Sequence, residues 1–236
     1  MTKTLSLGVI VPFYNEEKFL EKSISRLIQL DIVNQIVLVD DYSTDSSYSI
    51  AENISSMHSS VFLTQTSMNS GKGAAVKKGL ELISTTHVIV HDADLEYFPE
   101  DIPEMFNQIN PDEDCLVLGS RTLGSKERTN LYFFTYFGNK VLTILFSILN
   151  NRKLSDIASC YWLVKVESLK KINLTEKGFT IEVEVLSKFI KNNINIVEVP
   201  IKYHARSYED GKKIKFKDGM KILFTIIKFS KINIFN

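Results

Sequence analysis

The sequence of 236 residues predicts an α/β protein whose mostly parallel sheet is flanked by helices. Three observations support this fold class. Apolar, β-branched runs alternate with helical patterns in the first half, 44% of the residues are hydrophobic, and 28 basic residues balance 28 acidic ones. Such an alternation is typical of βαβ units, in which right-handed crossovers cover both faces of a parallel sheet.

Five apolar runs are expected to be strands of this sheet: residues 7–11, 35–39, 61–65, 87–90 and 115–118. Each is followed by a turn signal, and all but the last are followed by a helical pattern. Ligands bind at the carboxyl ends of strands in sheets of this kind. The polar residues that follow the first four strands are therefore expected to converge on one crevice.

The first helix is expected to begin at Asn15. Asparagine is a good N-cap, and Glu16 and Glu17 suit the positive end of a helix dipole. The apolar face of this helix would consist of Leu20, Ile24, Leu27 and Ile28.

The second half is less regular. It predicts an aromatic, apolar helix over 131–150, a strand over 160–166, a helix around 182–191, a strand over 195–203 and a final helix. No internal repeat or low-complexity linker divides the chain. We therefore expect one catalytic domain over residues 1–215 and an amphipathic C-terminal helix over 216–236.

Composition excludes several classes of protein. A net charge of zero gives no overall field that would attract nucleic acid. Cys115 and Cys160 lie in apolar, strand-like runs, which argues against disulfides and Cys-based zinc sites and favours a reducing cytosol.

The N-terminal apolar run is too short for a signal peptide, and no run reaches the roughly 18 apolar residues that a spanning helix needs. The expected location is cytoplasmic.

Two segments are candidates for peripheral contact with the inner face of a membrane. Residues 131–150 are strongly apolar but carry Gly138, Asn139 and Lys140 at their centre, and the tail from Met220 mixes apolar residues with lysines. Both could be interfacial helices, and both could instead pack on the protein's own core. In the tail, the apolar side would consist of Ile222, Leu223, Ile226, Ile227 and Phe229, and the lysines are Lys221, Lys228 and Lys231.

Three carboxylates at alternate positions close the fourth strand: Asp92, Asp94 and Glu96. Alternate side chains share a face while the backbone stays extended, whereas a turn after Asp94 would separate Glu96 from the others. Oxygen ligands of this kind favour Mg²⁺ or Mn²⁺ over zinc. The pattern indicates a metal shared with a diphosphate, and the alternative is a solvated turn before the helix at Pro99.

Asp40, Asp41 and Asp45 follow the second strand, where a carboxylate can accept hydrogen bonds from a ribose or a base. Ser43 or Thr44 could also cap the next helix. The third strand is followed by Asn-Ser-Gly-Lys-Gly at 69–73, which lacks the spacing of a Walker phosphate-binding loop. Lys72 in this loop is expected near an anion-attracting helix terminus.

Eight segments together resemble glycosyltransferase family 2, the inverting enzymes of GT-A (Rossmann-like) fold. Within that family the chain is similar to dolichyl-phosphate mannose synthases and bacterial polyprenyl-phosphate glycosyltransferases. The segments are, in order, VPFYNEE, VDDYSTDSS, NSGKGAAVKKG, DADLE, GSR, SDIASCYWLVK, GFTIEVEV and VEVPIKYHARSYEDGKKI. Two departures from the family pattern are Ala158 in place of Glu and Trp162 in place of Lys.

The resemblance implies roles for individual residues. The nucleotide-sugar site would include Pro12, Tyr14, Asn15, Glu16, Asp40, Asp41, Lys72, Asp92, Ala93 and Asp94. Asp92, Asp94 and Glu96 would bind Mg²⁺ or Mn²⁺. Phosphates of donor or acceptor would meet Arg121, Arg128, Arg206 and Lys212, and the last two belong to a loop expected to order over those phosphates.

The implied activity is transfer of a hexose from a UDP- or GDP-sugar to a polyprenyl phosphate, with inversion. A phosphate acceptor is already ionised near pH 7 and needs no general base. For a hydroxyl acceptor, the base candidates are Asp156 and Glu182. Two alternatives remain: a family 2 enzyme that glycosylates a saccharide hydroxyl, and a nucleotide-sugar-binding protein without turnover.

Overall fold

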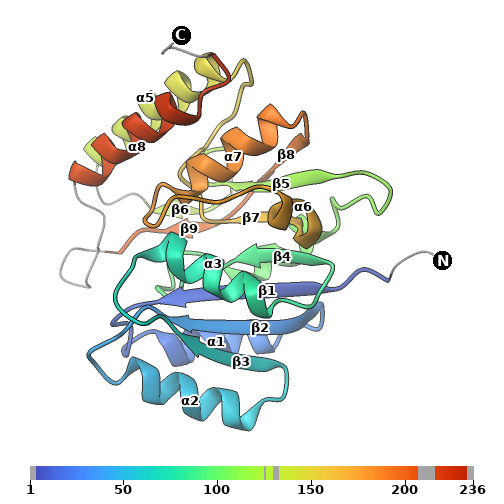
Figure 1. Ribbon diagram of the computed structural model, residues 1–236, viewed down its shortest axis with the longest axis vertical. Coiled ribbons are helices and arrows are strands. Elements are labelled where there is room, and N and C mark those ends of the chain that lie inside the picture. Colours follow the sequence, from blue (N-terminus) through green and yellow to red (C-terminus); the bar gives the residue numbers. More distant parts are fainter. Residues whose placement is uncertain (1–3, 125, 130–132, 207–215, 233–236) are drawn as a thin grey trace.

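The computed structural model describes residues 4–124, 126–129, 133–206 and 216–232. It contains a seven-stranded sheet in the order β3-β2-β1-β4-β7-β5-β8 (Figure 1). Its strands are β1 Leu7–Phe13, β2 Val33–Asp40, β3 Val61–Gln65, β4 His87–Val90, β5 Cys115–Ser120, β7 Trp162–Lys165 and β8 Asn195–Pro200. The predicted α/β fold with a mostly parallel sheet is confirmed.

One strand breaks the parallel pattern. β7 lies antiparallel between β4 and β5, whereas β1 pairs in parallel with β2 and β4, β2 with β3, and β5 with β8. A separate two-stranded sheet joins β6 Arg128–Thr129 to β9 Tyr203–His204. The strand predicted over 195–203 is therefore two strands in two sheets.

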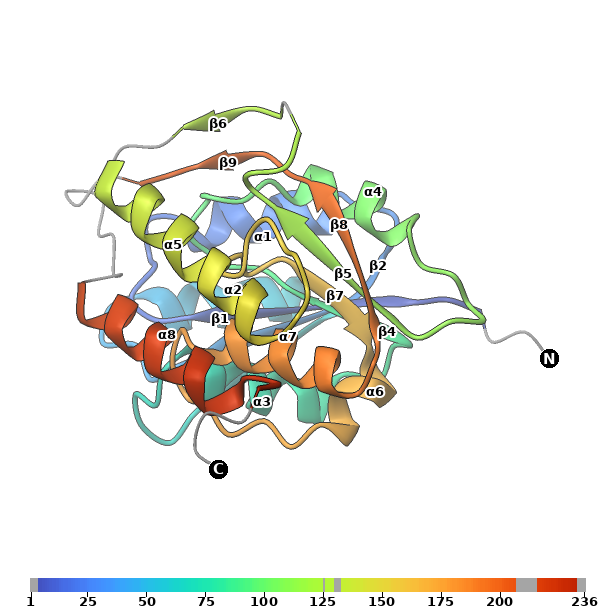
Figure 2. The ribbon, with the colours of Figure 1, turned by 90° about the horizontal axis from the view of Figure 1, so that it is seen from above.

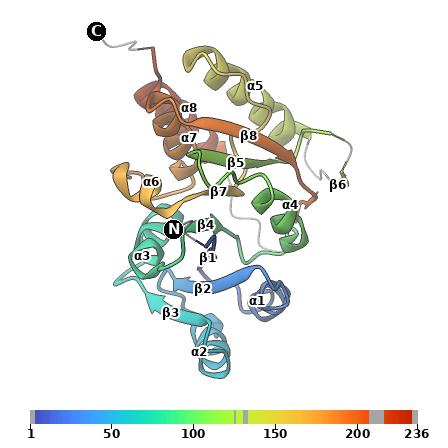
Figure 3. The ribbon, with the colours of Figure 1, turned by 90° about the vertical axis from the view of Figure 1, so that its right-hand side faces the viewer.

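Helices cover both faces of the sheet (Figure 3). One apolar core lies between the sheet and α1, α2 and α4, and the other lies between the sheet and α3, α5, α7 and α8. The helices are α1 Leu20–Ile28, α2 Ser47–Met57, α3 Lys72–Leu82, α4 Ile102–Phe106, α5 Phe133–Leu149, α6 Val166–Lys171, α7 Ile181–Lys191 and α8 Phe216–Phe229, with a 3₁₀ turn at Pro99–Asp101.

The predicted start of the first helix at Asn15 is wrong. Asn15 has a φ of 51°, a left-handed conformation that helix capping does not use, and α1 begins at Leu20. A turn precedes the helix, in which the amides of Phe19 and Leu20 donate to the carbonyl of Glu16. The predicted apolar face is correct for Leu20, Ile24 and Leu27, which are fully buried.

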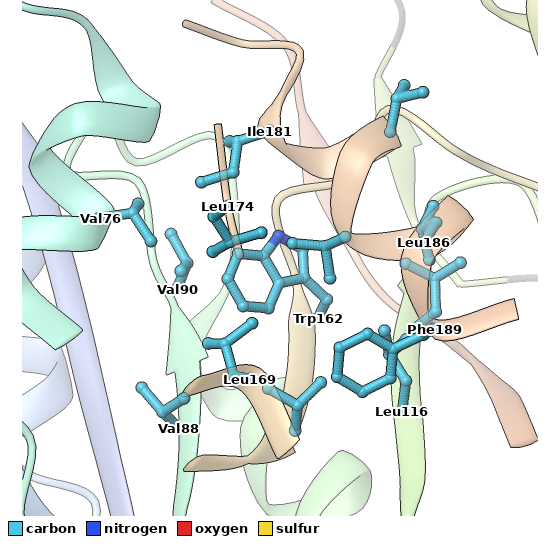
Figure 4. Packing of buried hydrophobic residues seen from close by; sticks show 14 of the residues in the cluster. Val76, Val88, Val90, Leu116, Trp162, Leu169, Leu174, Ile181, Leu186 and Phe189 are labelled. Carbon is cyan, nitrogen blue, oxygen red and sulfur yellow. The ribbon is translucent and has the colours of Figure 1, made fainter. Parts of the chain in front are cut away.

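Trp162, one of the two departures from the family pattern, lies in the core (Figure 4). Its side chain is fully buried on β7, among residues of β4, β5, α6 and α7. Its indole N–H has no hydrogen-bond partner among the described residues. This position is therefore part of the packed interior and does not line the cavity described below.

α5 and α8 lie side by side on the outside of α7 (Figures 1 and 2). Of the two alternatives for the C-terminal helix, packing on the core holds for the main members of its apolar side: Ile222 is 7% exposed and Ile226 is fully buried. α5 instead presents the exposed apolar residues. Among the described residues no helix has both the length and the apolar character needed to cross a bilayer.

Candidate active site

A cavity of about 240 Å³ lies at the carboxyl ends of β1, β2 and β4. The structure brings most of the predicted site residues to its wall. Those that line it are Pro12, Tyr14, Glu16, Asp41, Lys72, Asp92, Ala93, Asp94, Glu96, Arg121, Glu182 and Arg206. Asn15, Asp40, Arg128 and Asp156 do not line this cavity, and Lys212 lies outside the described residues.

The loop after β1 is attached to the loop after β2. The Asn15 amide donates to Ser43 Oγ at 3.0 Å, the Glu16 amide donates to Ser47 Oγ at 2.8 Å, and Asn15 Oδ1 accepts from the Thr44 amide at 2.8 Å. Because Asn15 bridges these loops, it holds Tyr14 and Glu16 at the cavity without lining it.

The two aspartates that end β2 have different positions. Asp40 is fully buried and accepts hydrogen bonds from the Ser43 amide at 3.0 Å and from Gln65 Nε2 at 2.7 Å. Asp41 lines the cavity, and its carboxylate accepts from the amides of Ser70 and Gly71 at 2.9 and 2.7 Å. Asp41 therefore attaches the loop before α3 to the end of β2.

The acidic loop after β4 turns between its second and third carboxylates. Leu95 has a φ of 62°, so the backbone is not extended, yet the Glu96 side chain still lines the cavity. Glu96 accepts from the Tyr203 hydroxyl at 2.6 Å and from the Arg206 amide at 2.8 Å. Asp92 is held by Lys72, whose Nζ lies 2.8 and 2.9 Å from its two oxygens.

Asp94 is buried next to other carboxylates. Burial, together with the neighbouring carboxylates of Glu96 and Asp92, raises the pKa of Asp94 to about 7, against the partial relief that Arg206 supplies. Among the described residues, no three His, Cys, Asp or Glu side chains are grouped closely enough to bind a metal by themselves. A cation bound here would therefore need further ligands from water or from a bound molecule.

Lys72 Nζ also lies 2.7 Å from Glu182 Oε1, so one ammonium joins two carboxylates. Burial opposes the charge on Lys72, but Asp92 and Glu182 raise its pKa well above the ordinary value. Burial also opposes ionisation of both acids: Lys72 outweighs it at Asp92, whose pKa is lowered, but not at Glu182, whose pKa is raised. Lys72 thus holds the carboxylates of Asp92 and Glu182 in the cavity wall.

Arg206 joins three parts of the site. Its guanidinium lies 3.0 Å from Glu16 and 3.3 Å from Asp94, and it stacks over the Phe19 ring at 5.2 Å. Burial disfavours its charge, but Asp94 and Glu16 raise the pKa of Arg206 above its ordinary value. The loops after β1 and β4 are therefore linked to the segment after β9 by one cation.

Arg121 and Asp156 form a buried bidentate pair with N–O distances of 2.7 and 2.8 Å. Arg121 outweighs the effect of burial and lowers the pKa of Asp156. Arg121 also borders a second cavity of about 240 Å³. There Arg128 donates to the Arg121 carbonyl at 2.9 Å and stacks on Tyr136 at 4.8 Å.

Several cavity residues escaped the sequence-based prediction. Tyr97 directly follows the DADLE segment, and Tyr203 belongs to the VEVPIKYHARSYEDGKKI segment. Their positions next to these motifs could have identified them. Asp218 and Ile222 belong to α8, and no sequence pattern places that helix beside strands that precede it by more than 100 residues. Phe179 and Ala158 also line the cavity.

Comparison with curated proteins gives relatives of modest identity. The chain is 29% identical over 231 residues to dolichol-phosphate mannosyltransferase of Pyrococcus furiosus, with 96% of this chain and 64% of that protein covered. It is 28% identical over 236 residues to UDP-N-acetylglucosamine--dolichyl-phosphate N-acetylglucosaminyltransferase of Methanococcus voltae, covering 93% and 94%. The chain thus spans less than two thirds of the first relative's length.

Solved structures agree on the fold. Glucosyl-3-phosphoglycerate synthase from Mycobacterium tuberculosis, crystallised with Mn²⁺, UDP and glucosyl-3-phosphoglycerate, superposes with a TM-score of 0.74 at 16% identity, covering 96% of this chain and 80% of that one. Residues 8–173 match the family described as Glycosyl transferase family 2. The chain belongs to glycosyl transferase family 2 and is a glycosyltransferase.

Proposed function

We propose that this glycosyltransferase moves a hexose from a UDP- or GDP-sugar to a polyprenyl phosphate. The observation that carries the proposal is the joint position of Asp94, Arg121 and Arg206 at one cavity. A carboxylate that could hold a divalent cation, together with two arginines, suits a substrate in which a diphosphate departs. The names of the Pyrococcus and Methanococcus relatives support a dolichyl-type phosphate as acceptor.

The donor would bind with its nucleotide toward the loops after β1 and β2 and its diphosphate toward Asp94. Lys72 contacts Asp92 at 2.8 Å and the Tyr203 hydroxyl donates to Glu96 at 2.6 Å, whereas the Arg206 guanidinium lies 3.3 Å from Asp94, so we propose Asp94 as the main metal ligand. These ligands fit Mg²⁺ or Mn²⁺, because they are carboxylate oxygens and the charges of Glu96 and Asp92 act on Asp94 as well as that of Arg206. Such an ion would neutralise charge on the leaving diphosphate.

The described carboxylates favour a phosphate acceptor over a hydroxyl. Arg121 binds both oxygens of Asp156, so this predicted base is not free to take a proton, whereas Lys72 contacts Glu182 through Oε1 alone. A phosphate monoester needs no base, since its second pKa of about 6 leaves it largely dianionic at pH 7. The saccharide-hydroxyl alternative therefore loses Asp156, one of its two predicted bases.

The second cavity suits the phosphate end of the acceptor. It is lined by Arg128, Lys140 and Arg121, against one carboxylate from Asp156. Lys140 and Ile144 belong to α5, so the cavity borders the exposed face of that helix. A lipid phosphate in this cavity would have its tail beside an apolar surface.

That surface, here named the α5 stripe, consists of Phe137, Val141, Ile144 and Ile148, which are 49–63% exposed. Residues at this spacing share one face of a helix. In the neighbouring helix α8, Met220 and Phe224 are also exposed. The exposed lysines on or near the two helices are Lys140, Lys217, Lys221, Lys228 and Lys231. An apolar face bordered by lysines suits peripheral contact with an anionic bilayer, which we propose at the cytoplasmic face.

Screening radiolabelled UDP- and GDP-sugars against polyprenyl phosphate and free glycans tests the function. We expect product only with a polyprenyl phosphate and a divalent ion. Transfer to a free glycan but not to the lipid would support the saccharide alternative. Binding of a nucleotide sugar with no transfer to either acceptor class would support the binding protein.

A further inference from the structure

Glu182 is a carboxylate of the cavity wall whose hydrogen bonding is incomplete. It is 4% exposed, it lines the cavity, and its Oε1 accepts from Lys72 at 2.7 Å. Its Oε2 is buried and has no hydrogen-bond partner in the described part of the chain. A buried acceptor left without a donor costs about 1–3 kcal/mol, and more when it is charged.

Glu184, on the same helix, shows how a carboxylate of purely structural role is arranged. It is fully buried and does not line the cavity. Its Oε1 accepts from the Thr175 amide at 2.7 Å and from Lys188 at 2.6 Å, and its Oε2 accepts from the Glu176 amide at 2.8 Å. Both of its oxygens are satisfied within the protein, so the incomplete bonding of Glu182 is specific to the cavity side of α7.

The surroundings of Glu182 restrict what could bind it. The Lys72 ammonium at 2.7 Å already supplies a cation, which disfavours a metal ion next to it. Lys72 is shared with Asp92, so two carboxylates face one ammonium, and this excess negative charge repels phosphate groups. A neutral hydrogen-bond donor remains, and in a nucleotide sugar the sugar ring carries several hydroxyl donors.

We propose that Glu182 Oε2 accepts a hydrogen bond from a hydroxyl group of the donor sugar, and that Lys72 is a positioning residue that orients this carboxylate. The inference rests on the proposed function and adds to it a residue that selects the sugar. The nucleotide and diphosphate would bind elsewhere, along Asp41, Asp94 and Arg206. A site built to accept from a hydroxyl discriminates against a sugar that lacks it, because the carboxylate oxygen stays unpaired.

Isothermal titration calorimetry with UDP, GDP, UDP-glucose and GDP-mannose tests the inference on the wild type, Glu182→Ala and Glu182→Gln. For the nucleotide sugar that the wild type prefers, we expect Glu182→Ala to weaken binding about tenfold, with the affinity for the free nucleotide diphosphate unchanged. Glu182→Gln keeps a carbonyl oxygen as acceptor and should recover part of the loss. Glu184→Gln is the matched control, with lower stability but unaltered sugar-dependent affinity.

Monodeoxy analogues of that donor give a second test that needs no stable variant. One analogue should bind the wild type about tenfold more weakly and should lose nothing further in Glu182→Ala. Equal losses for nucleotide and nucleotide sugar in Glu182→Ala, or a wild type indifferent to every deoxy position, would overturn the inference. Failure of the wild type to bind any nucleotide sugar would instead overturn the proposed function.

Discussion

The two halves of the molecule differ in how far along the chain the cavity residues lie from the strands that they lie beside. In the first half, β1, β2 and β4 run parallel, and the short loops that follow them all reach the cavity. In the second half, β7 runs antiparallel between β4 and β5, and α8 returns to cover the cavity after an interval of many residues. Position along a parallel strand therefore predicts a site residue well, whereas position along a surface helix does not.

The two outer helices sharpen this contrast. Both are rich in apolar residues, and either could have been the one with an outward apolar face. α8 buries Ile222 and Ile226 in the core shared with α3 and α7, and α5 leaves Ile144 and Ile148 more than half exposed. The neighbours of each helix, more than its own composition, decide which side is covered.

The largest expected effect falls on the first half. Asp94→Asn is nearly isosteric, so the fold should persist, but the anionic ligand is lost and transfer should fall about a thousandfold. The measurement is the initial rate of transfer with Mg²⁺ or Mn²⁺, alongside circular dichroism as a check on folding. Normal turnover by this variant, or full wild-type activity in excess EDTA, would show that the metal assignment is wrong.

In the second half, Asp156→Ala should act on stability through Arg121. Removing the carboxylate leaves a buried guanidinium without its partner, and the free energy of unfolding should fall by about 3 kcal/mol in urea titrations. Glu167→Ala, at an exposed ion pair with Lys171, is the control and should change stability by less than about 0.5 kcal/mol. A stable Asp156→Ala protein that has lost transfer to a hydroxyl acceptor alone would restore Asp156 as a base.

The contrast between the outer helices predicts opposite results for two truncations of isoleucine. Ile226→Ala should lower the free energy of unfolding by about 2 kcal/mol or more, because it opens a cavity in the core. Ile148→Ala should change stability by no more than about 0.5 kcal/mol and should weaken sedimentation with anionic liposomes. Liposome binding that survives replacement of the whole α5 stripe by serine would assign membrane contact to another surface.

The smallest effect concerns His91, which lies between the halves. Its ring nitrogens contact Ser23 Oγ at 3.0 Å and the Tyr161 hydroxyl at 2.7 Å, and burial lowers the pKa of His91 to about 4. Since the unfolded chain has a histidine pKa near 6.5, the unfolded state takes up the proton first as pH falls. Stability is therefore lost through the window from pH 6.5 to 4.

Between pH 7.5 and 5.5 the loss attributable to His91 should be about 1.3 kcal/mol. The measurement is the free energy of unfolding of the wild type minus that of His91→Asn at each pH, which cancels the contributions of other groups. A difference that does not vary with pH would mean that the folded protein accepts the proton on His91 as easily as the unfolded chain does.

The site was predictable to the extent that its residues follow strands. Asp41, Asp92 and Asp94 were found because each ends an apolar run, and Arg121 and Arg206 because their motifs resemble those of a known family. Asn15 was predicted to line the site and to cap a helix. It instead has a left-handed backbone conformation in a turn, and its side chain bonds to the loop after β2. Asp218 went unnoticed because α8 reaches the cavity only through packing on α5 and α7.

By itself, the sequence determined the alternation of strands and helices, the loops that reach the cavity and the family of the enzyme. These properties follow from local periodicity and from the shared direction of parallel strands, both of which are present in the order of residues. Only the tertiary structure decided that β7 is antiparallel, that Asp156 binds Arg121, that Lys72 joins two carboxylates, and that α8 turns its apolar side inward. Each depends on a partner distant in sequence, and the burial that selects that partner exists only once the layers have packed.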